Sequence, residues 1–345
     1  MSLHQEIHEQ PAVIRHLLAA QSNQAARIAS AIQEADPRFA FLAARGTSDN
    51  AARYANYLWG IANGLPLALA TPSAFTLYQR PPRLRDALVV GISQSGRSPD
   101  IVRVVAEGRR QGNLTLAITN APHSPLAQAA AWTLDIQAGE ERSVAATKTY
   151  TAQLAAVALI SASLAQSQSM QTSLARVPRW MEAMLALDET IAQQAQRYRY
   201  MEQCVVLGRG YNYATAFEWA LKLKELTYIA AEPYSSADFQ HGPVAIVAQG
   251  YPVLAVAPAG AVLDSMRELL RYLHFKRRAE LVVISNDPEI LSWAQVALPL
   301  PADIPEWLSP LVSIVAAQLF TYHLTRAKGY DTERPRGLRK VTETT

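Results

Sequence analysis

The sequence lacks the features that mark several large classes of protein. It holds one cysteine, Cys204, among 345 residues, which excludes an internal disulfide framework and a cysteine-rich metal site. Cys204 precedes the apolar run Val205-Val206-Leu207, so we expect a small buried hydrophobe rather than a nucleophile. The longest apolar run, from Leu154 to Leu164, is shorter than the about 20 residues of a membrane span. No apolar signal region follows Met1. We therefore expect a soluble, cytoplasmic protein without a membrane partner.

An excess of charge of either sign is also missing. The chain has 32 lysines and arginines against 29 aspartates and glutamates, which gives a net charge of +3. No block of basic residues alternates with aromatic ones, which argues against nucleic acid as a partner. Half of the residues are hydrophobic, so the chain can build a sizeable core, and its length allows two domains of ordinary size.

The order of apolar segments predicts an α/β fold. Apolar residues at helical spacing run from about Pro11 to Asp36, and strands that alternate with helices follow. Such alternation is typical of a parallel sheet covered by helices on both faces. The expected strands are residues 39–44, 65–70, a strand that begins at about Leu88, 114–119 and 132–136, and a helix over about 147–166 closes the series.

The second half of the chain repeats this pattern. Gly46 has a counterpart in Gly210 at an offset of 164 residues, and Asn120 has one in Asn286 at an offset of 166. The repeated strands are residues 205–207, 253–258, 281–286 and 297–300, and the repeated closing helix is 310–328. Several matches at nearly one offset predict two copies of one α/β unit. We therefore divide the chain into an N-terminal helical segment (1–36), a first domain (37–168), a helical linker (169–196), a second domain (197–330) and a C-terminal tail (331–345).

An anion site is predicted in the first copy, between Leu88 and Asp100. A strand ends there in the turn Ser93-Gln94-Ser95-Gly96, and Ser98 and Pro99 stand at the N-cap and the first position of a helix. Hydroxyl groups and free N–H groups therefore converge at the positive end of a helix dipole. Because the lysine of a P-loop is missing, a sugar phosphate fits better than a nucleoside triphosphate.

A neighbouring turn is expected to face the same ligand. Thr47 and Ser48 follow the strand at 39–44, and the carboxyl ends of parallel strands share one edge of the sheet. The second copy has Ala257-Pro258-Ala259-Gly260 in place of the hydroxyls. We therefore expect one copy to bind phosphate and the other to contribute something else.

A second group of residues suits proton transfer. Glu218, Lys222 and Glu225 share one helix face at positions i, i+4 and i+7. A solvated ladder of ion pairs is the plainer interpretation of that spacing. However, His241 follows in the constrained turn before Gly242-Pro243. A carboxylate, a lysine and a histidine near a sugar phosphate provide what proton transfer between adjacent carbons needs.

The basic tail from Asp331 onward has the composition of a frayed terminus. Pro335, Gly337 and Leu338 nevertheless predict an ordered turn, with Leu338 as its apolar anchor. A lysine held in that turn could form an imine with a sugar carbonyl.

Together these motifs resemble the sugar isomerase (SIS) family, in particular the isomerase half of glucosamine-6-phosphate synthase. The resemblance spans essentially the whole chain and rests on Gly46-Thr47-Ser48, Ser93-Gln94-Ser95-Gly96, residues 144–148, Leu221-Lys222-Leu223-Lys224-Glu225, His241-Gly242-Pro243 and residues 335–340. Residues 96–100, 143–151 and 340–344 are more similar to stand-alone members, which include a second type of glucosamine-6-phosphate deaminase and related deglycases.

The resemblance implies an α/β fold of two tandem SIS domains, each a flavodoxin-like, doubly wound parallel sheet flanked by helices. It also implies a homodimer with its sites at the subunit interface, a phosphosugar as ligand, and neither a metal nor an organic cofactor. The phosphate would be held by Thr47, Ser48, Ser93, Gln94, Ser95 and Ser98.

The resemblance further implies a role for each catalytic residue. Glu225 would move a proton between C1 and C2 of the sugar, with Lys222 beside it. His241 of the neighbouring subunit would open the sugar ring, and Lys340 would meet the carbonyl carbon. Sugar contacts would come from Glu141, Val144 and Ala146, the last of which replaces a serine of the synthase.

The expected reaction is the isomerising deamination of glucosamine 6-phosphate to fructose 6-phosphate and ammonia. The chain starts with Met1-Ser2 instead of the cysteine nucleophile of a glutaminase domain, so we expect no hydrolysis of glutamine. Alternatives are aldose–ketose isomerisation of an amino sugar phosphate, deglycation of fructosamine 6-phosphate, and synthase-like amino transfer from free ammonia. A non-catalytic sugar-phosphate sensor is a fourth, but a sensor does not need Glu225, His241 and Lys340 together.

Overall fold

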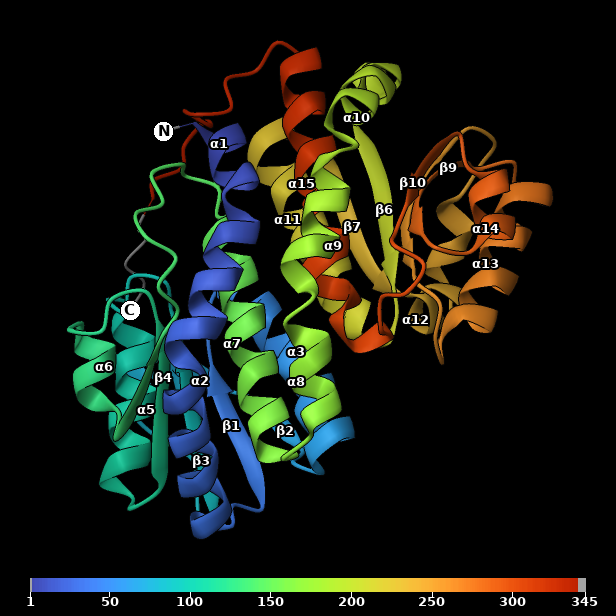
Figure 1. Ribbon diagram of the computed structural model, residues 1–345. Coiled ribbons are helices and arrows are strands. Elements are labelled where there is room, and N and C mark those ends of the chain that lie inside the picture. Colours follow the sequence, from blue (N-terminus) through green and yellow to red (C-terminus); the bar gives the residue numbers. More distant parts are fainter. Residues whose placement is uncertain (1, 341–345) are drawn as a thin grey trace. The chain divides into compact units, whose positions relative to one another are not determined.

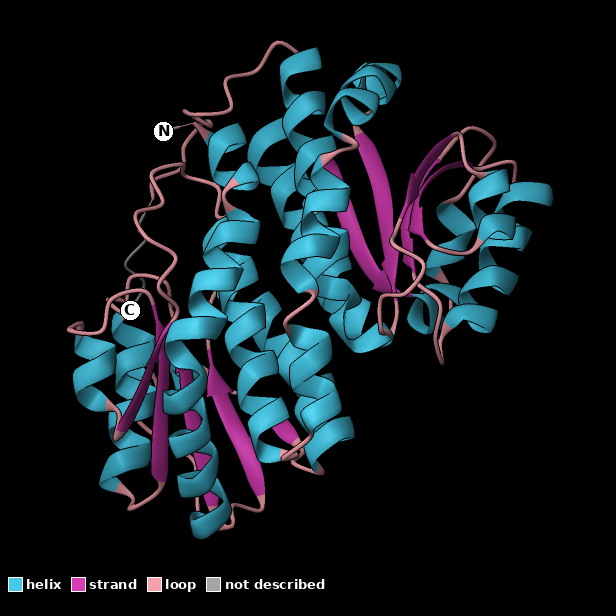
Figure 2. Cartoon of the chain, viewed as in Figure 1, coloured by secondary structure: helices cyan, strands magenta, loops and turns pink. Residues whose placement is uncertain are grey.

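Two five-stranded parallel sheets, each flanked by helices, make up the computed structural model, which describes residues 2–340 (Figures 1 and 2). The first unit comprises Glu9–Glu141, Lys148–Arg176 and, in the tail, Arg339 and Lys340. The second unit comprises the residues up to His8, Arg142–Thr147 and Val177–Leu338. Residues 341–344, which contribute to the family resemblance, lie outside the described residues.

The first unit contains the sheet with the order β2-β1-β3-β4-β5. Helices α4, α5 and α6 cover one face of this sheet, and α2, α3 and α7 cover the other (Figure 1). The elements are α2 (Gln10–Ala35), β1 (Phe39–Ala43), α3 (Thr47–Asn63), β2 (Leu67–Leu69), α4 (Pro72–Thr76), β3 (Ala87–Ile92), α5 (Pro99–Arg110), β4 (Leu114–Thr119), α6 (Pro125–Ala129), β5 (Trp132–Asp135), α7 (Lys148–Leu164) and α8 (Gln168–Leu174).

The second unit contains the sheet with the order β10-β9-β8-β6-β7. Its helices are α1 (Leu3–His8), α9 (Val177–Leu185), α10 (Asp188–Ala195), α11 (Tyr213–Thr227), α12 (Ser236–Gln240), α13 (Leu263–Phe275), α14 (Pro288–Trp293) and α15 (Ser309–Ala327). Its strands are β6 (Gln203–Gly208), β7 (Ala230–Ser235), β8 (Pro252–Ala257), β9 (Glu280–Ser285) and β10 (Val296–Pro299). Short 3₁₀ turns are η1 (Gln196–Tyr200), η2 (Gly210–Asn212), η3 (Pro243–Ile246) and η4 (Glu306–Leu308).

The two sheets have the same topology. Numbered within its own unit, each sheet has the strand order 2-1-3-4-5, which is that of flavodoxin-like folds. The predicted fold class and the internal repeat are therefore confirmed. One strand, β7, was missed because its sequence contains Glu232 and Pro233 and has no apolar run. It lies at the edge of its sheet, where a proline is tolerated since no further strand needs its N–H.

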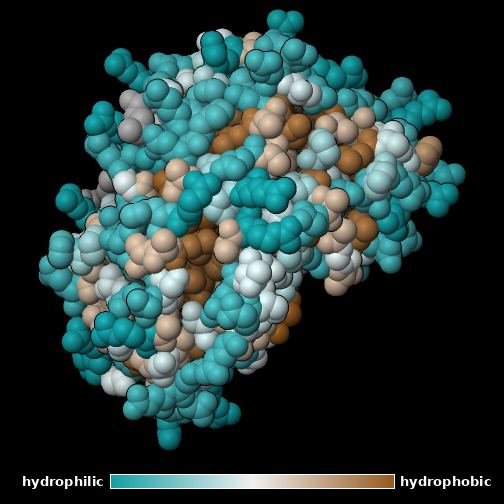
Figure 3. Space-filling model, viewed as in Figure 1, coloured by the Kyte–Doolittle hydropathy of each residue, from teal (hydrophilic) through white to brown (hydrophobic). Residues whose placement is uncertain are grey.

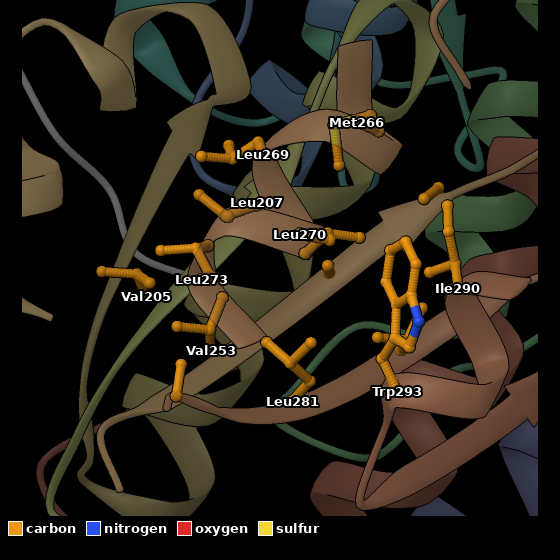
Figure 4. Packing of buried hydrophobic residues seen from close by; sticks show 14 of the residues in the cluster. Val205, Leu207, Val253, Met266, Leu269, Leu270, Leu273, Leu281, Ile290 and Trp293 are labelled. Carbon is orange, nitrogen blue, oxygen red and sulfur yellow. The ribbon is translucent and has the colours of Figure 1, made fainter. Parts of the chain in front are cut away.

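The core of the second unit forms between β6, β8 and β9 and the helices α13 and α14. Figure 4 shows Leu269, Leu270 and Leu273 of α13 facing Val253 and other strand residues. These leucines are at most 3% exposed, and burying each leucine stabilises a fold by about 1.5–3 kcal/mol. The same face of α13 therefore holds the helix against the sheet and fixes the turns at its ends.

One helical segment among the described residues is long and apolar enough for a membrane span. It comprises η4 and α15 (Glu306–Ala327), and 94% of its apolar window is buried inside the protein. Figure 3 shows mainly hydrophilic side chains on the face in view, broken by apolar patches. We interpret α15 as the central helix of the second unit, packed against α11 and α9.

Candidate active site

The serine turn after β3 is held in shape by its own hydroxyl oxygens. Ser93 Oγ accepts the N–H of Gly96 (3.1 Å), and Ser95 Oγ accepts the N–H of Arg97 (3.3 Å). Gly96 has a φ of +63°, and a Cβ there would lie 2.0 Å from Ser124 Oγ, so no other residue fits. Because each serine oxygen acts as acceptor within the turn, its O–H remains available to donate to an anion.

The helix that follows the turn begins where the sequence predicts. Ser98 occupies the N-cap position of α5 and Pro99 the first helical position. The predicted N-cap position of Ser98 is confirmed, although its hydroxyl makes no cap hydrogen bond. The hydroxyl of Ser98 is therefore not committed to the first turn of α5.

The turn between β1 and α3 lies at the same edge of the sheet as the serine turn. Arg45 Nε pairs with Asp100 Oδ2 of α5 at 2.8 Å, and Asp100 is 1% exposed. Thr47 begins α3, and the buried Ser48 accepts a hydrogen bond from Gln153 Nε2 (3.0 Å). The half-exposed Arg45 adds a cation that the sequence analysis did not single out. The predicted proximity of the two turns is thus observed within the first unit.

The equivalent turn of the second unit contains its own anion. Glu306 Oε2 accepts the N–H of Ala261 (2.7 Å), and a Cβ on Gly260 would lie 2.2 Å from the same oxygen. A fixed carboxylate at this turn repels a phosphate. This carboxylate is a second reason, beside the missing hydroxyls, for the prediction that only the first copy binds phosphate.

Lys340, in the tail, is paired within the first unit. Its Nζ lies 2.6 Å from Glu141 Oε2, and the Glu141 side chain is fully buried. The same carboxylate accepts the Thr149 hydroxyl (2.7 Å) and the Thr149 N–H (3.1 Å). These contacts suit a residue that positions Lys340, and the expected sugar contact of Glu141 stays a prediction.

The turn that precedes Lys340 is ordered, but not by Leu338. Leu338 is 42% exposed, so the expected apolar anchor is wrong. Arg336 anchors the turn instead, because its guanidinium stacks 4.6 Å from the ring centre of Tyr228 and 5.1 Å from that of Tyr330. The N–H of Arg336 also donates to Tyr228 Oη (2.8 Å).

The predicted proton-transfer face of α11 is largely buried. Lys222 is 2% exposed, and its Nζ lies 2.5 Å from Glu225 Oε2 and 3.4 Å from Glu218 Oε1. Glu218 is fully buried, whereas the Glu225 side chain is 23% exposed. The ladder is therefore not solvated. Two carboxylates share one ammonium group in a site of low polarity, and the accessible one, Glu225, can exchange a proton with a ligand.

His241 lies in the constrained turn that its sequence context predicts. It is exposed, it follows the last residue of α12, and the next residue, Gly242, has a φ of +134°. A side chain on the surface of its own unit can reach a ligand bound elsewhere.

Val144 and Ala146 are half-buried in a segment of the second unit that α1 supports. Glu6 Oε1 accepts the N–H of Arg142 (2.6 Å), and Glu6 Oε2 accepts that of Ser143 (3.2 Å). Sequence analysis missed Glu6, because 136 residues separate it from Arg142 and no local pattern relates the two.

Cys204 is fully buried in β6, as predicted. Burial raises the pKa of its thiol well above the ordinary range, so the reactive thiolate is suppressed.

Comparison with known proteins agrees with this arrangement. The family model of the SIS domain matches residues 35–162 and 199–327. The chain belongs to the SIS domain family. Each match falls on one of the two parallel sheets, so the chain carries two SIS domains.

Among relatives, the isomerizing glutamine–fructose-6-phosphate aminotransferase of Gloeobacter violaceus is 35% identical over 352 residues, covering 97% of this chain. The match covers 57% of that protein, so this chain spans little more than half the length of such relatives. The C-terminal domain of glucosamine-fructose-6-phosphate aminotransferase from Francisella tularensis has a TM-score of 0.86 at 28% identity, covering 96% of this chain and 98% of that one.

Glucosamine-6-phosphate deaminase from Thermotoga maritima has a TM-score of 0.78 over the full length of both chains, at 19% identity. This last likeness concerns the fold alone. The recognised family and the relation to the isomerase half of the aminotransferase are thus confirmed.

Proposed function

We propose that this protein is an isomerising deaminase that converts glucosamine 6-phosphate and water into fructose 6-phosphate and ammonia. The observation that carries the proposal is the Glu218–Lys222–Glu225 cluster, in which one carboxylate of a buried ionic group remains accessible. The serine turn with Arg45 supplies the phosphate site. We further propose that the protein is cytoplasmic.

The proposed reaction is a proton transfer followed by hydrolysis. His241 promotes opening of the sugar ring, which exposes the C1 aldehyde. Glu225 removes the C2 proton, the resulting enolamine takes a proton back at C1, and the amino group becomes an imine at C2. Ammonia then leaves C2 and water supplies the oxygen of the C2 ketone of fructose 6-phosphate. Lys222 balances the charge that Glu225 gains and loses.

Lys340 is proposed to meet the carbonyl carbon of the open chain. Its neutral amine adds to the C2 imine and expels ammonia, and water then hydrolyses the lysine imine to the C2 ketone and the free amine. Because only the neutral amine adds, a nearby base must first take the proton of Lys340. Glu141, 2.6 Å away, can hold that proton while Lys340 moves toward the sugar. The pairing therefore supports a reactive role for Lys340, with Glu141 as its positioning residue.

A second candidate is the reverse reaction, amino transfer to fructose 6-phosphate from free ammonia. The 35% identity to an isomerizing aminotransferase over nearly the whole chain favours it. Both directions pass through the same open-chain imine and need the same residues. Concentrations of ammonia then decide the direction, and most ammonia at neutral pH is the non-nucleophilic ammonium ion.

The test is a coupled assay run in both directions with the purified chain. Glucosamine 6-phosphate should yield fructose 6-phosphate and ammonia, synthesis should need high ammonium, and glutamine should not serve. Lys340→Ala should abolish most turnover in both directions, while Lys276→Ala, an exposed lysine at the end of α13, should not.

Three outcomes contradict the proposal. Formation of glucosamine 6-phosphate from glutamine indicates a synthase. Release of ammonia or amine from fructosamine 6-phosphate alone indicates a deglycase. Tight binding of sugar phosphates without turnover indicates a sensor.

A further inference from the structure

A cluster of histidines surrounds one carboxylate in the second unit, in a place that the proposed reaction does not use. His4 Nε2 lies 2.7 Å from Asp188 Oδ2, and His323 Nε2 lies 2.6 Å from Asp188 Oδ1. His8 Nε2 lies 3.4 Å from Asp188 Oδ2. The residues come from α1, α10 and α15, and Figure 1 shows α1 beside α15. Three segments distant in the sequence therefore aim four donor groups at one point.

The orientation of His8 indicates that a cation belongs in this cluster. His8 Nδ1 lies 2.9 Å from the carbonyl oxygen of His4, which can only accept, so Nδ1 carries a proton. In the neutral ring, Nε2 is then the lone-pair nitrogen, and it faces the carboxylate of Asp188. Two acceptors facing each other repel. A cation bound between the His8 ring and the carboxylate of Asp188 removes this repulsion.

Protonation of the histidines is the weaker solution. The rings of His4 and His8 are 4.4 Å apart between centroids, and those of His4 and His323 are 5.9 Å apart. One carboxylate neutralises one imidazolium, so further protons would place like charges side by side. A single divalent ion instead uses the lone pairs of neutral imidazoles and the charge of Asp188 together.

The neighbours fix the rings in position and leave access from solvent. Tyr322 stacks on His4 at 4.8 Å with an interplanar angle of 29°, and its edge meets His323 at 5.0 Å. The Nδ1–carbonyl hydrogen bond of His8 is the kind of contact that orients metal-binding histidines. The side chains of His4 and His8 are 33% and 37% exposed, so an ion can enter.

We propose that His4, His8, Asp188 and His323 bind a divalent transition-metal ion of the zinc type. Three imidazole nitrogens and one carboxylate oxygen suit zinc and its neighbours, whereas magnesium and calcium prefer oxygen ligands throughout. The donor atoms of His4, Asp188 and His323 lie within 4.8 Å of one another. Ligands about 2.0 Å from a tetrahedral ion lie about 3.3 Å apart, so small side-chain rotations accommodate it.

The ion would have a structural effect on the helix that supports residues 142–147. Glu6, between His4 and His8 on α1, is fully buried and holds the backbone of Arg142 and Ser143. A metal ion that joins α1 to α10 and α15 would therefore hold Glu6 in place. Glu6 in turn holds Arg142 and Ser143, at the start of the segment that contains Val144 and Ala146. None of the four residues has a role in the proposed reaction and the test measures metal binding, so it does not depend on the proposed activity.

The experiment is a zinc titration of untagged protein against a coloured zinc chelator, followed by cobalt substitution. We expect one zinc ion per chain and, with Co²⁺, the intense visible bands of a four-coordinate site. His323→Gln and Asp188→Asn should each weaken binding at least about a hundredfold, since each removes a direct ligand, and even the loss of an outer partner costs 10–100-fold. His16→Gln, an exposed histidine on α2, should bind as the wild type does.

Thermal unfolding provides a second readout. Zinc should raise the melting temperature of the wild type and of His16→Gln, but not that of His323→Gln or Asp188→Asn. If either variant fails to fold, the double variant His4→Gln/His8→Gln, whose side chains are partly exposed, takes its place. Equal zinc affinity in the wild type and the ligand variants, or no zinc bound at micromolar concentrations, would overturn the proposal.

Discussion

At the scale of single residues, each hydroxyl of the serine turn can play two hydrogen-bonding roles: its oxygen accepts a backbone N–H, and its O–H can donate to an anion. The oxygens of Ser93 and Ser95 accept N–H groups of the turn itself, so each O–H is left to donate to the proposed phosphate ligand. This division needs Gly96, whose backbone conformation and contact with Ser124 exclude a side chain. The shape of this turn is thus a property of four consecutive residues, Ser93 to Gly96, and the sequence predicts it; that it binds phosphate stays a prediction.

Replacing Ser95 with alanine tests that site. A hydrogen bond to a charged group contributes about 1.5–3 kcal/mol, so Ser95→Ala should raise the Kd for fructose 6-phosphate about tenfold or more. Isothermal titration calorimetry measures the affinity. Ser30→Ala, an exposed serine of α2, is the matched control and should leave it unchanged. An unaltered Kd in Ser95→Ala would show that the hydroxyl does not bind the phosphate.

Other residues of the candidate site could not be placed from the sequence. The spacing of Glu218, Lys222 and Glu225 predicts that they share one face of a helix, but it does not predict whether that face is exposed to solvent. Burial of this face depends on packing between α11 and α15, which lie far apart in the chain. The support that Glu6 gives to Arg142 and the stacking of Arg336 on Tyr228 are contacts of the same long-range kind.

At the scale of elements, close approach of helices to the sheet depends on small residues. Gly108 of α5 lies against β3, where a Cβ would come within 2.7 Å of Val89 Cγ2. Gly60 of α3 is the opposite case, because a Cβ added there would have no other atom within 4 Å. Strand β7 shows the limit of pattern analysis, because an edge strand needs neither an apolar run nor every N–H.

The two glycines form a matched pair for stability. Gly108→Ala should destabilise the protein by about 1–3 kcal/mol, because a methyl group overpacks the interface between α5 and β3. Gly60→Ala should stabilise it by about 0.5–1 kcal/mol, because alanine is the better helix former and meets no neighbour. Urea unfolding monitored by circular dichroism gives both values. A shift of the same sign in both variants would contradict the packing described here.

At the scale of the whole molecule, one α/β unit occurs twice, and the two copies differ in the turn that follows one pair of corresponding strands. The strand order is the same in both sheets, which the offsets between Gly46 and Gly210 and between Asn120 and Asn286 predict. The copies differ at one turn, where Ser93 to Ser95 stand in the first and the carboxylate of Glu306 in the second. Duplication therefore accounts for the common fold. Local substitution at this turn accounts for the prediction that only the first copy binds phosphate.

The assembly of the protein remains a prediction that mixed subunits can test. If His241 serves the site of a neighbouring subunit, Glu225→Gln and His241→Asn homodimers should each be inactive. Hybrids of the two should regain part of the activity, because one of their two sites then contains neither substitution. The measurement is turnover of glucosamine 6-phosphate by hybrids purified with two different affinity tags. Inactive hybrids of verified composition would place both residues in the site of one subunit.

The central claim is that Glu225 moves the proton between C1 and C2 of a phosphosugar. The most direct measurement is the rate at which deuterium leaves C2 of [2-²H]glucosamine 6-phosphate, followed by NMR. The wild type should transfer the label to C1 of fructose 6-phosphate or to water, and Glu225→Gln should do so at least about a hundredfold more slowly. Glu268→Gln, an exposed glutamate of α13, should match the wild type. Loss of the label from C2 at the wild-type rate in Glu225→Gln would contradict the mechanism.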